Sequence, residues 1–355
     1  MKNKISGFIV IMVMAFFITS LFFVGCGATN DNEIVINLDE IKDVTTEKFT
    51  DLRITDNKGD TIYFGQIADI FLGADSNIMI IESEKSRIVQ LDKNGNFKKY
   101  IGRPGGGPGE VISPSIGIYY NDNHYIVDNY AQLLQKFDKD MEYLTYYRIK
   151  LPAASDIAFI NENEIISINQ EGDEHIFFFI DTLGNIIRSF GDIKVNEEGL
   201  LIKGKQRRSS AIRFVYDPLY KHIFLVSTGA PIIRRFDLNG NLLQRINIEG
   251  ERIATLNVTA EQAKQNASPN SIEAGTLYLL SPSILEGHKL LVTVGGFGSL
   301  VLHYDENDII DIKLIKYNII TENEIMRSPL GLKDYNNIKL LSDILFGNLL
   351  VNTNK

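Results

Sequence analysis

Cysteine is almost absent from this chain, and tryptophan is absent altogether. The 355 residues include one cysteine, Cys26, so no disulfide can form within the chain and a hydrophobic core must hold the fold together. Five histidines offer little material for a metal centre, which needs clustered ligands. The bulky packing that tryptophan would supply falls to 20 Phe and 15 Tyr residues.

Positive charge is also scarce. The chain has 36 basic and 45 acidic residues, which gives a formal net charge of −9. Removal of an export signal that contains Lys2 and Lys4 would leave 34 basic residues and a net charge of −11. Nucleic-acid binding needs clustered positive charge, so the sequence predicts no nucleic-acid partner.

The N-terminus has the layout of a bacterial export signal. Two early lysines precede an almost wholly apolar run, 5–24, and small residues follow in VGCG. Such a run can also form a transmembrane helix. The stretch LFFVGC, which ends at Cys26, resembles a bacterial lipobox, although Phe23 stands where the pattern prefers leucine. This resemblance implies cleavage before Cys26 and lipidation of its thiol; the alternative is a simple N-terminal anchor with a buried cysteine.

Both alternatives place the rest of the chain outside the cytoplasm and tethered to a membrane. We therefore predict a signal peptide over 1–25, a lipidated linker over 26–32 and a folded domain over 33–355. The expected location is the cell envelope, at the outer membrane, on either its periplasmic or its surface side. Contact with the membrane is expected through the lipid anchor only.

A short pattern recurs along the folded domain: apolar residues, Asp, two variable residues, Gly-Asn and further apolar residues. Clear copies are IVQLDKNGNFKKYIG from Ile88, FFFIDTLGNIIRSFG from Phe177 and IIRRFDLNGNLLQRI from Ile232, and weaker copies start at Leu133 and Leu300. The aspartates are Asp92, Asp138, Asp181, Asp237 and Asp305, spaced 46, 43, 56 and 68 residues apart. Each copy predicts a β-hairpin, because Asp bonds the backbone ahead of it and glycine accepts positive φ.

A short strand precedes each hairpin. These strands are expected at 77–83, 124–129, 164–170, 222–228 and 289–295, with a sixth at 348–353 that has no hairpin after it. The missing outer strands can come from the strand-like segments 33–38 and 49–55. Four-stranded units of roughly forty residues, closed end to end, are typical of a β-propeller. The sequence predicts an all-β, six-bladed propeller of four-stranded antiparallel blades, closed by N-terminal strands that complete the last blade.

A family resemblance supports this architecture. The stretch 100–138, which runs from YIGRPGGGPGEV to LLQKFD, resembles an NHL-type propeller repeat. Its element GGGPGE resembles the G-x-G-P-G-E hallmark of six-bladed propeller lipoproteins of Gram-negative bacteria. The resemblance implies the propeller fold and a location in the envelope, and it implies no activity.

The glycine-rich stretch 101–111 does not fit a nucleotide loop. A P-loop needs Gly-Lys-Ser/Thr at the start of a helix, whereas VISPSIGIYY follows Glu110. The dinucleotide spacing fails as well, because Glu110 stands where the third glycine would fall. We predict a crossover between two blades, with Arg103 paired to Glu110. Its structural residues are Gly105, Gly107, Pro108, Gly109 and Glu110.

Propeller geometry sorts the loops onto two faces. The hairpin face carries the short Asp-x-x-Gly-Asn turns and the turns that enter the second strands, where His124, His222 and His288 lie. The crossover face carries the second-to-third turns, the blade crossovers and the insertions 192–210, 249–275 and 317–337. Insertions confined to one face of a repeat fold indicate a binding face. Its candidate residues are Arg87, Arg103, Asp128, Tyr130, His175, Lys203, Lys205, Arg207, Arg208 and Phe297.

The chemistry of these candidates leaves alternatives open. The basic run KGKQRRSS is either a solvated loop or a site for an anionic partner such as an acidic glycan, a phosphate or a carboxylate-rich surface. Tyr130 and Phe297 can stack on sugar or fill the funnel between blades. Asp173 and Glu174, or Asp128, leave hydrolysis of sugar open. No catalytic signature is found, and no cofactor or metal is predicted.

These observations predict a cell-envelope lipoprotein whose propeller binds a protein partner or a glycan or peptide ligand. The alternative is a propeller hydrolase or lyase that acts on glycan or peptide at the channel mouth. A third possibility is a purely structural subunit of an envelope complex.

Overall fold

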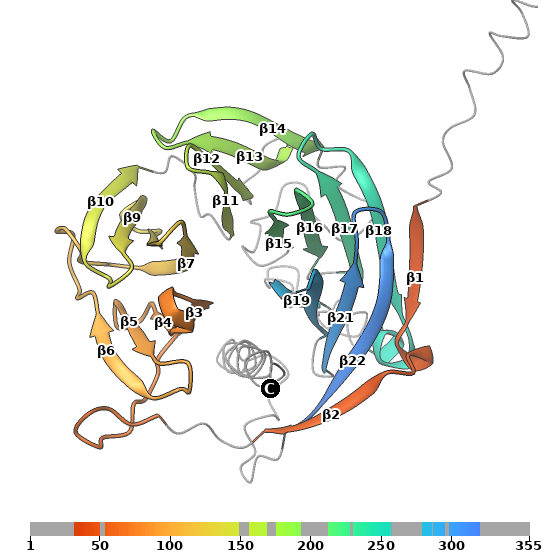
Figure 1. Cartoon of the computed structure of the whole chain (residues 1–355), viewed down its shortest axis with the longest axis horizontal. Helices are drawn as coiled ribbons and strands as arrows, with labels where there is room; N and C mark the ends of the chain where they lie inside the picture. The colour runs from red at the N-terminus through yellow and green to blue at the C-terminus, as the bar shows by residue number, and fades with distance from the viewer. Residues whose placement is uncertain are drawn as a thin grey trace, which may run out of the picture.

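In the part of the chain that the computed structural model describes, five blades, each of four consecutive antiparallel strands, follow one another around a ring (Figure 1). The first strand of each sheet lies nearest the centre of the ring and the fourth lies at the rim. The structure describes residues 32–49, 54–148, 156–168, 175–192, 212–227, 230–255, 257, 279–285, 287–294 and 298–319. The predicted propeller of four-stranded antiparallel blades is confirmed; the strand expected at 348–353 lies outside the described residues.

Each sheet is one blade of consecutive strands. Blade 1 contains β3 (Ile67–Leu72), β4 (Ile78–Glu82), β5 (Arg87–Leu91) and β6 (Phe97–Ile101). Blade 2 contains β7 (Pro114–Tyr120), β8 (Asn123–Asp128), β9 (Leu133–Asp138) and β10 (Tyr143–Arg148). Blade 3 contains β11 (Ile157–Asn161), β12 (Glu164–Ile168), β13 (His175–Asp181) and β14 (Ile186–Asp192). Blade 4 contains β15 (Ile212–Asp217), β16 (His222–Ser227), β17 (Ile232–Asp237) and β18 (Leu242–Glu249). Blade 5 contains β19 (Leu279–Leu285), β20 (Lys289–Val294), β21 (Gly298–Tyr304) and β22 (Ile309–Ile319).

The repeated aspartates close the third-to-fourth turns, as the sequence predicts. At Asp237, Oδ1 accepts the backbone N–H groups of Asn239 at 2.9 Å and Asn241 at 2.8 Å. The other carboxylate oxygen accepts the Asn241 side-chain amide at 2.8 Å. Gly240 adopts φ +89° within this turn, a conformation that favours glycine. The same bonds recur around Asp92 and Asp181.

Replacing one of these aspartates tests the turn. Asp237→Ala is expected to lower the free energy of unfolding by about 1–2 kcal/mol, because two backbone N–H groups lose a charged acceptor. Asp237→Asn keeps an acceptor oxygen and should cost clearly less. Urea denaturation of both variants checks this; equal losses would contradict the assigned role of the side chain.

The second and third strands of the blades form the core. All five residues of β4 and all six of β16 are buried, which explains why these strands are continuous apolar runs rather than alternating ones. Blades pack face to face, so both surfaces of a central strand meet apolar neighbours. In blade 3, Phe177 is fully buried and its ring contacts those of Phe190, Phe214 and Phe236.

The N-terminal segment joins the rim of the propeller. β2 (Val44–Phe49) pairs with β22 of the last described blade, and β1 (Glu33–Asn37) pairs with β18 of blade 4. Both pairings are parallel and add a fifth strand, whereas the sequence predicted strands that complete a blade. The predicted strand 49–55 is also different, because Phe49 ends β2 and a narrow turn bridged at Thr55 and Thr61 follows the undescribed residues.

Burial of apolar side chains explains why the N-terminal segment lies along the rim of blades 4 and 5. Ile36 and Leu38 are 3 % exposed and lie in one hydrophobic cluster with Ile246, Ile253 and Leu314 from blades 4 and 5 and the helical turn after β18. Pairing with an existing edge strand satisfies the backbone of the segment while its apolar side chains reach the core. The segment therefore acts as a strap across two blades.

Candidate functional site

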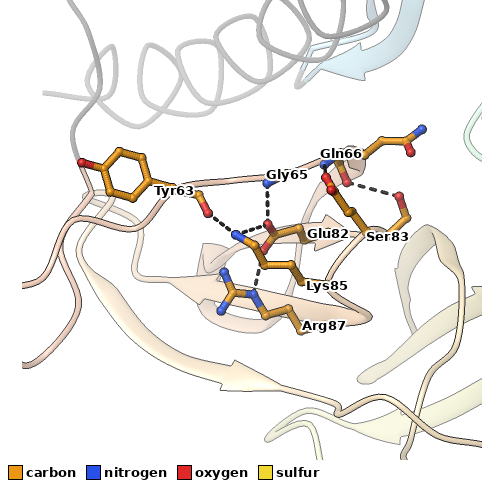
Figure 2. A network of polar contacts seen from close by, with 8 residues as sticks. Tyr63, Gly65, Gln66, Glu82, Ser83, Lys85 and Arg87 are labelled. Atoms are coloured by element: carbon orange, nitrogen blue, oxygen red, sulfur yellow. Dashed lines mark hydrogen bonds and ion pairs between the residues drawn. The ribbon is translucent and has the colours of Figure 1, made fainter.

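A buried carboxylate organises the crossover face of blade 1. Glu82 ends β4 and is fully buried. Its Oε1 accepts the backbone N–H of Gly65 at 2.5 Å and lies 2.8 Å from Lys85 Nζ, and its Oε2 accepts Arg87 Nε at 2.6 Å (Figure 2). The turn 83–86 brings both cations back to this carboxylate. One acid therefore fixes two basic side chains and the segment that leads into β3.

The ionisation of Glu82 follows from these contacts. Burial by itself would raise the pKa of this carboxyl, because it disfavours the charged form. Hydrogen bonds from Gly65, Lys85 and Arg87, together with the charge of Arg87, outweigh burial and lower the pKa below its ordinary value. Glu82 is therefore an anion under physiological conditions, and its role is to hold the cations rather than to transfer protons.

The network presents a cation and an aromatic ring to solvent. The Lys85 side chain is 41 % exposed, and its Nζ also donates to the carbonyl of Tyr63. Tyr63 is 78 % exposed, and Figure 2 shows its ring pointing away from Glu82. The Arg87 guanidinium is more enclosed, since its Cζ lies 4.2 Å from the centre of the Tyr100 ring. An anionic ligand with an apolar or sugar face fits this combination.

The equivalent acid in blade 2 has a purely structural place. Asp128 ends β8 and is 1 % exposed. It accepts the backbone N–H groups of Ile112 at 2.6 Å, Ser113 at 3.2 Å and Ala131 at 3.1 Å. Its oxygens are thus occupied by the crossover that it holds in place. Asp128, a candidate for the binding face, lies beneath that face.

The glycine-rich crossover has the predicted internal ion pair. Arg103 Nε donates to Glu110 Oε1 at 2.7 Å, and Glu110 Oε2 accepts the N–H of Gly107 at 2.8 Å. Gly105, at φ +155°, and Gly109, at φ +74°, let the chain fold tightly over this carboxylate. A Cβ on Gly105 would lie 2.1 Å from Glu110 Oε2. The stretch turns the chain between blades, and no phosphate cradle is formed.

The remaining candidates divide into two groups. Tyr130 lies on the crossover face in the second-to-third turn of blade 2 and is 76 % exposed. His175 opens β13, where its backbone pairs with Asp192. Five other candidates, and two of the three acids considered for sugar hydrolysis, lie outside the described residues: Lys203, Lys205, Arg207, Arg208, Phe297, Asp173 and Glu174.

Sequence reasoning named Arg87 but missed Glu82, Lys85 and Tyr63. The signal that could have found Glu82 is its position, because Glu82 and Asp128 both close the second strand of their blade. An acid at that point faces the backbone of the incoming crossover. The role of Tyr63 had no such signal, because it precedes the first repeat.

A second polar cluster lies on the hairpin face, between blades 4 and 5. Arg235 is fully buried and donates Nε to His222 Nδ1 at 3.1 Å and Nη2 to the carbonyl of Glu306 at 2.8 Å. Burial, and then the charge of Arg235, lower the pKa of His222 to about 4, so His222 is neutral and accepts. The Tyr304 hydroxyl donates to the buried Asp217 at 2.8 Å. This cluster joins two blades.

Neither a membrane-spanning helix nor a metal-binding group is found in the described part of the chain. None of the helices there has the length and apolar character needed to cross a bilayer. Within the same residues, no three His, Cys, Asp or Glu side chains are grouped so as to hold a metal ion.

Four-stranded blades arranged radially, with loops sorted onto two faces, define a β-propeller. The chain belongs to the family described as 6-bladed beta-propeller, whose model matches residues 26–268. No curated protein matches the chain.

Several solved structures are similar to the chain at low identity. A candidate exported protein of Bacteroides fragilis NCTC 9343 is 16 % identical, with a TM-score of 0.47 over 77 % of this chain and 80 % of that one. A streptogramin B lyase is 13 % identical, with a TM-score of 0.42 over 76 % of each chain. Virginiamycin B lyase from Staphylococcus aureus is 12 % identical, with a TM-score of 0.41 over 76 % of this chain and 77 % of that one. Such likeness says nothing about a ligand or a reaction of this chain.

Proposed function

We propose that this protein is a lipid-anchored propeller of the cell envelope that binds a carboxylate-bearing glycan or peptide at its crossover face. The observation that carries the proposal is the pair of cations that the buried Glu82 holds at 2.8 and 2.6 Å, with Lys85 and Tyr63 still open to solvent. Cations held in place before binding lose less conformational entropy when an anion docks.

The sequence adds two supports to this proposal. The lipobox-like LFFVGC stretch favours an anchor at Cys26, outside the cytoplasm. The basic run at 203–208 belongs to an insertion assigned to the same face, and it would add positive charge to an otherwise acidic protein. A protein partner could offer the same carboxylates through an acidic peptide segment.

The proposal is tested by affinity for defined probes. Full-length protein in detergent is titrated calorimetrically with an oligogalacturonate, an oligoglutamate peptide and, as a neutral control, maltoheptaose. One of the two acidic probes should bind and the neutral one should not, and preference between the two acids distinguishes glycan from peptide. Tyr63→Ala should weaken binding about tenfold, which corresponds to about 1.4 kcal/mol. It removes only an exposed ring and leaves the carbonyl that Lys85 uses.

A matched variant on the opposite face controls for non-specific loss. Leu219→Ala truncates a similarly exposed side chain of the hairpin face and should leave the affinity unchanged. If Tyr63→Ala and Leu219→Ala bind equally well, or if no acidic probe binds, the assignment of the crossover face of blade 1 is wrong.

A further inference from the structure

The first described residues lie near the hairpin end of blade 4. β18 runs from that face at Leu242 to the crossover face at Glu249, and β1 lies parallel to it. Just before β1, Asn32 Nδ2 donates to the carbonyl of Leu243 at 2.6 Å, and the carbonyl of Asn32 accepts the N–H of Arg245 at 3.0 Å. These two bonds fix Asn32 beside Leu243 and Arg245, near the start of β18. The direction of β1 places Asn32, the first described residue, toward the hairpin end of β18.

The length of the tether limits how the propeller can sit. Cys26 and Asn32 are six residues apart, and a fully extended chain covers roughly 3.5 Å per residue, so the tether spans at most about 21 Å. Because Glu33 pairs with Arg245, Asn32 lies level with Gln244, roughly 7 Å from the hairpin end of β18 and roughly 17 Å from its crossover end. A tether of at most about 21 Å easily reaches a bilayer at the hairpin end, whereas it reaches the crossover end only if it runs back along the blade almost fully extended. The short tether therefore favours a membrane on the hairpin side of blade 4.

Exposed aliphatic side chains gather on the same side. Leu183 stands in the third-to-fourth turn of blade 3 and is 74 % exposed, and Leu219 stands in the first-to-second turn of blade 4 and is 59 % exposed. Ile186, Ile187, Leu242 and Ile310 are also exposed, each within the first two residues of a rim strand that starts at the hairpin face. The crossover face instead exposes the tyrosines Tyr63 and Tyr130. Exposed apolar side chains beside a short lipid tether can insert at the boundary between lipid headgroups and acyl chains.

We propose that the hairpin face of blades 3, 4 and 5 rests on the lipid surface and turns the crossover face toward the ligand. This orientation relies on the lipid anchor of the proposed function. The contact is apolar rather than ionic. The nearby turns contain the acids Glu306 and Asp308 and the base Lys221, so they offer no excess of positive charge to anionic lipid. Zwitterionic lipid is therefore sufficient.

Single-cysteine probes test the orientation on the full-length lipidated chain. Once the Cys26 thiol carries the lipid, an introduced cysteine is the only free thiol of the chain. L183C and L219C report the hairpin face, and Y63C and Y130C, at comparable exposure, report the crossover face. Each is labelled with bimane and reconstituted on phosphatidylcholine vesicles that contain 5-doxyl phosphatidylcholine. We expect several-fold stronger quenching at positions 183 and 219 than at 63 and 130.

Every other outcome overturns the orientation. Equal quenching on both faces, stronger quenching at 63 and 130, or no quenching at any position would each exclude a hairpin face resting on lipid. The intact mass of the same preparations separates this result from the anchor itself. A chain without the acyl mass would refute the lipid anchor, and the orientation with it. An acylated chain with the wrong quenching pattern would refute the orientation alone and leave ligand binding to be judged by calorimetry.

Discussion

Glu82→Ala is expected to lower the free energy of unfolding by about 3 kcal/mol, because removal of one partner from a buried ion pair leaves uncompensated groups behind. Lys85 and Arg87 lose their common anion, and the Gly65 N–H loses its acceptor. The loss falls at the lower end of the range for a broken buried ion pair, because Lys85 can still reach water. Urea denaturation measures the loss. The variant should also bind the acidic probe more weakly, since the cations are no longer held.

A neighbouring acid on the same turn controls for the loss of a negative charge. Glu84 is exposed and accepts only the N–H of Gln66, at 3.1 Å, among the bonds described for it. Glu84→Ala should therefore cost less than about 1 kcal/mol. Glu82→Gln, which keeps an acceptor but not the charge, should fall between the two. If Glu82→Ala were no more harmful than Glu84→Ala, the buried carboxylate would not organise this site.

Acid is expected to loosen the joint between blades 4 and 5 through His222. In the unfolded chain this imidazole takes up a proton near its ordinary pKa of 6.5, whereas in the folded protein its pKa is lowered to about 4. Between these values the unfolded state binds more protons, so stability is present above pH 6.5 and is lost as the pH falls toward 4. The difference corresponds to about 3 kcal/mol over that window.

The contribution of His222 is isolated by a variant that cannot titrate. His222→Asn keeps a side-chain acceptor near Arg235 but carries no ionisable ring. Urea midpoints at pH 7.5 and pH 4.5 should fall much less for this variant than for the native chain, and the effects of the carboxylates cancel in the comparison. An equal fall in both proteins would contradict the neutral, buried state of His222.

Much of the fold could be predicted because its signals are local. The Asp-x-x-Gly-Asn turns define hairpins within a few residues, and the regular spacing of Asp92, Asp138 and Asp181 shows that the unit repeats. The ion pair between Arg103 and Glu110 was likewise predictable, since both lie in one tight loop. The parallel pairing of β1 with β18 could not be predicted. It joins residues as far apart as Glu33 and Arg245, and it depends on which rim strand offers a hydrophobic place for Ile36.

The candidate site likewise contains features that the sequence predicted and features that it did not. Arg87 was predicted on the crossover face because repeat geometry places its turn there. The burial of Glu82 and of Asp128 was not predicted. From sequence alone, an acid at the end of a strand is interpreted as a solvated loop residue, because its spatial neighbours are unknown. Gly117 is a similar case: a Cβ there would lie 1.9 Å from Phe71 of the preceding blade, and no residue near Gly117 in the sequence predicts that contact.

The hairpin unit, its repetition around a ring and the division of loops between two faces follow from the amino-acid sequence, because turn chemistry and strand periodicity act over a few residues. The anionic state of Glu82, which holds Lys85 and Arg87, and the strap of the N-terminal segment across blades 4 and 5 emerge only in the folded chain. Those outcomes depend on burial and on contacts between residues far apart in the chain, and the energy of a charge or an edge strand is set by what surrounds it.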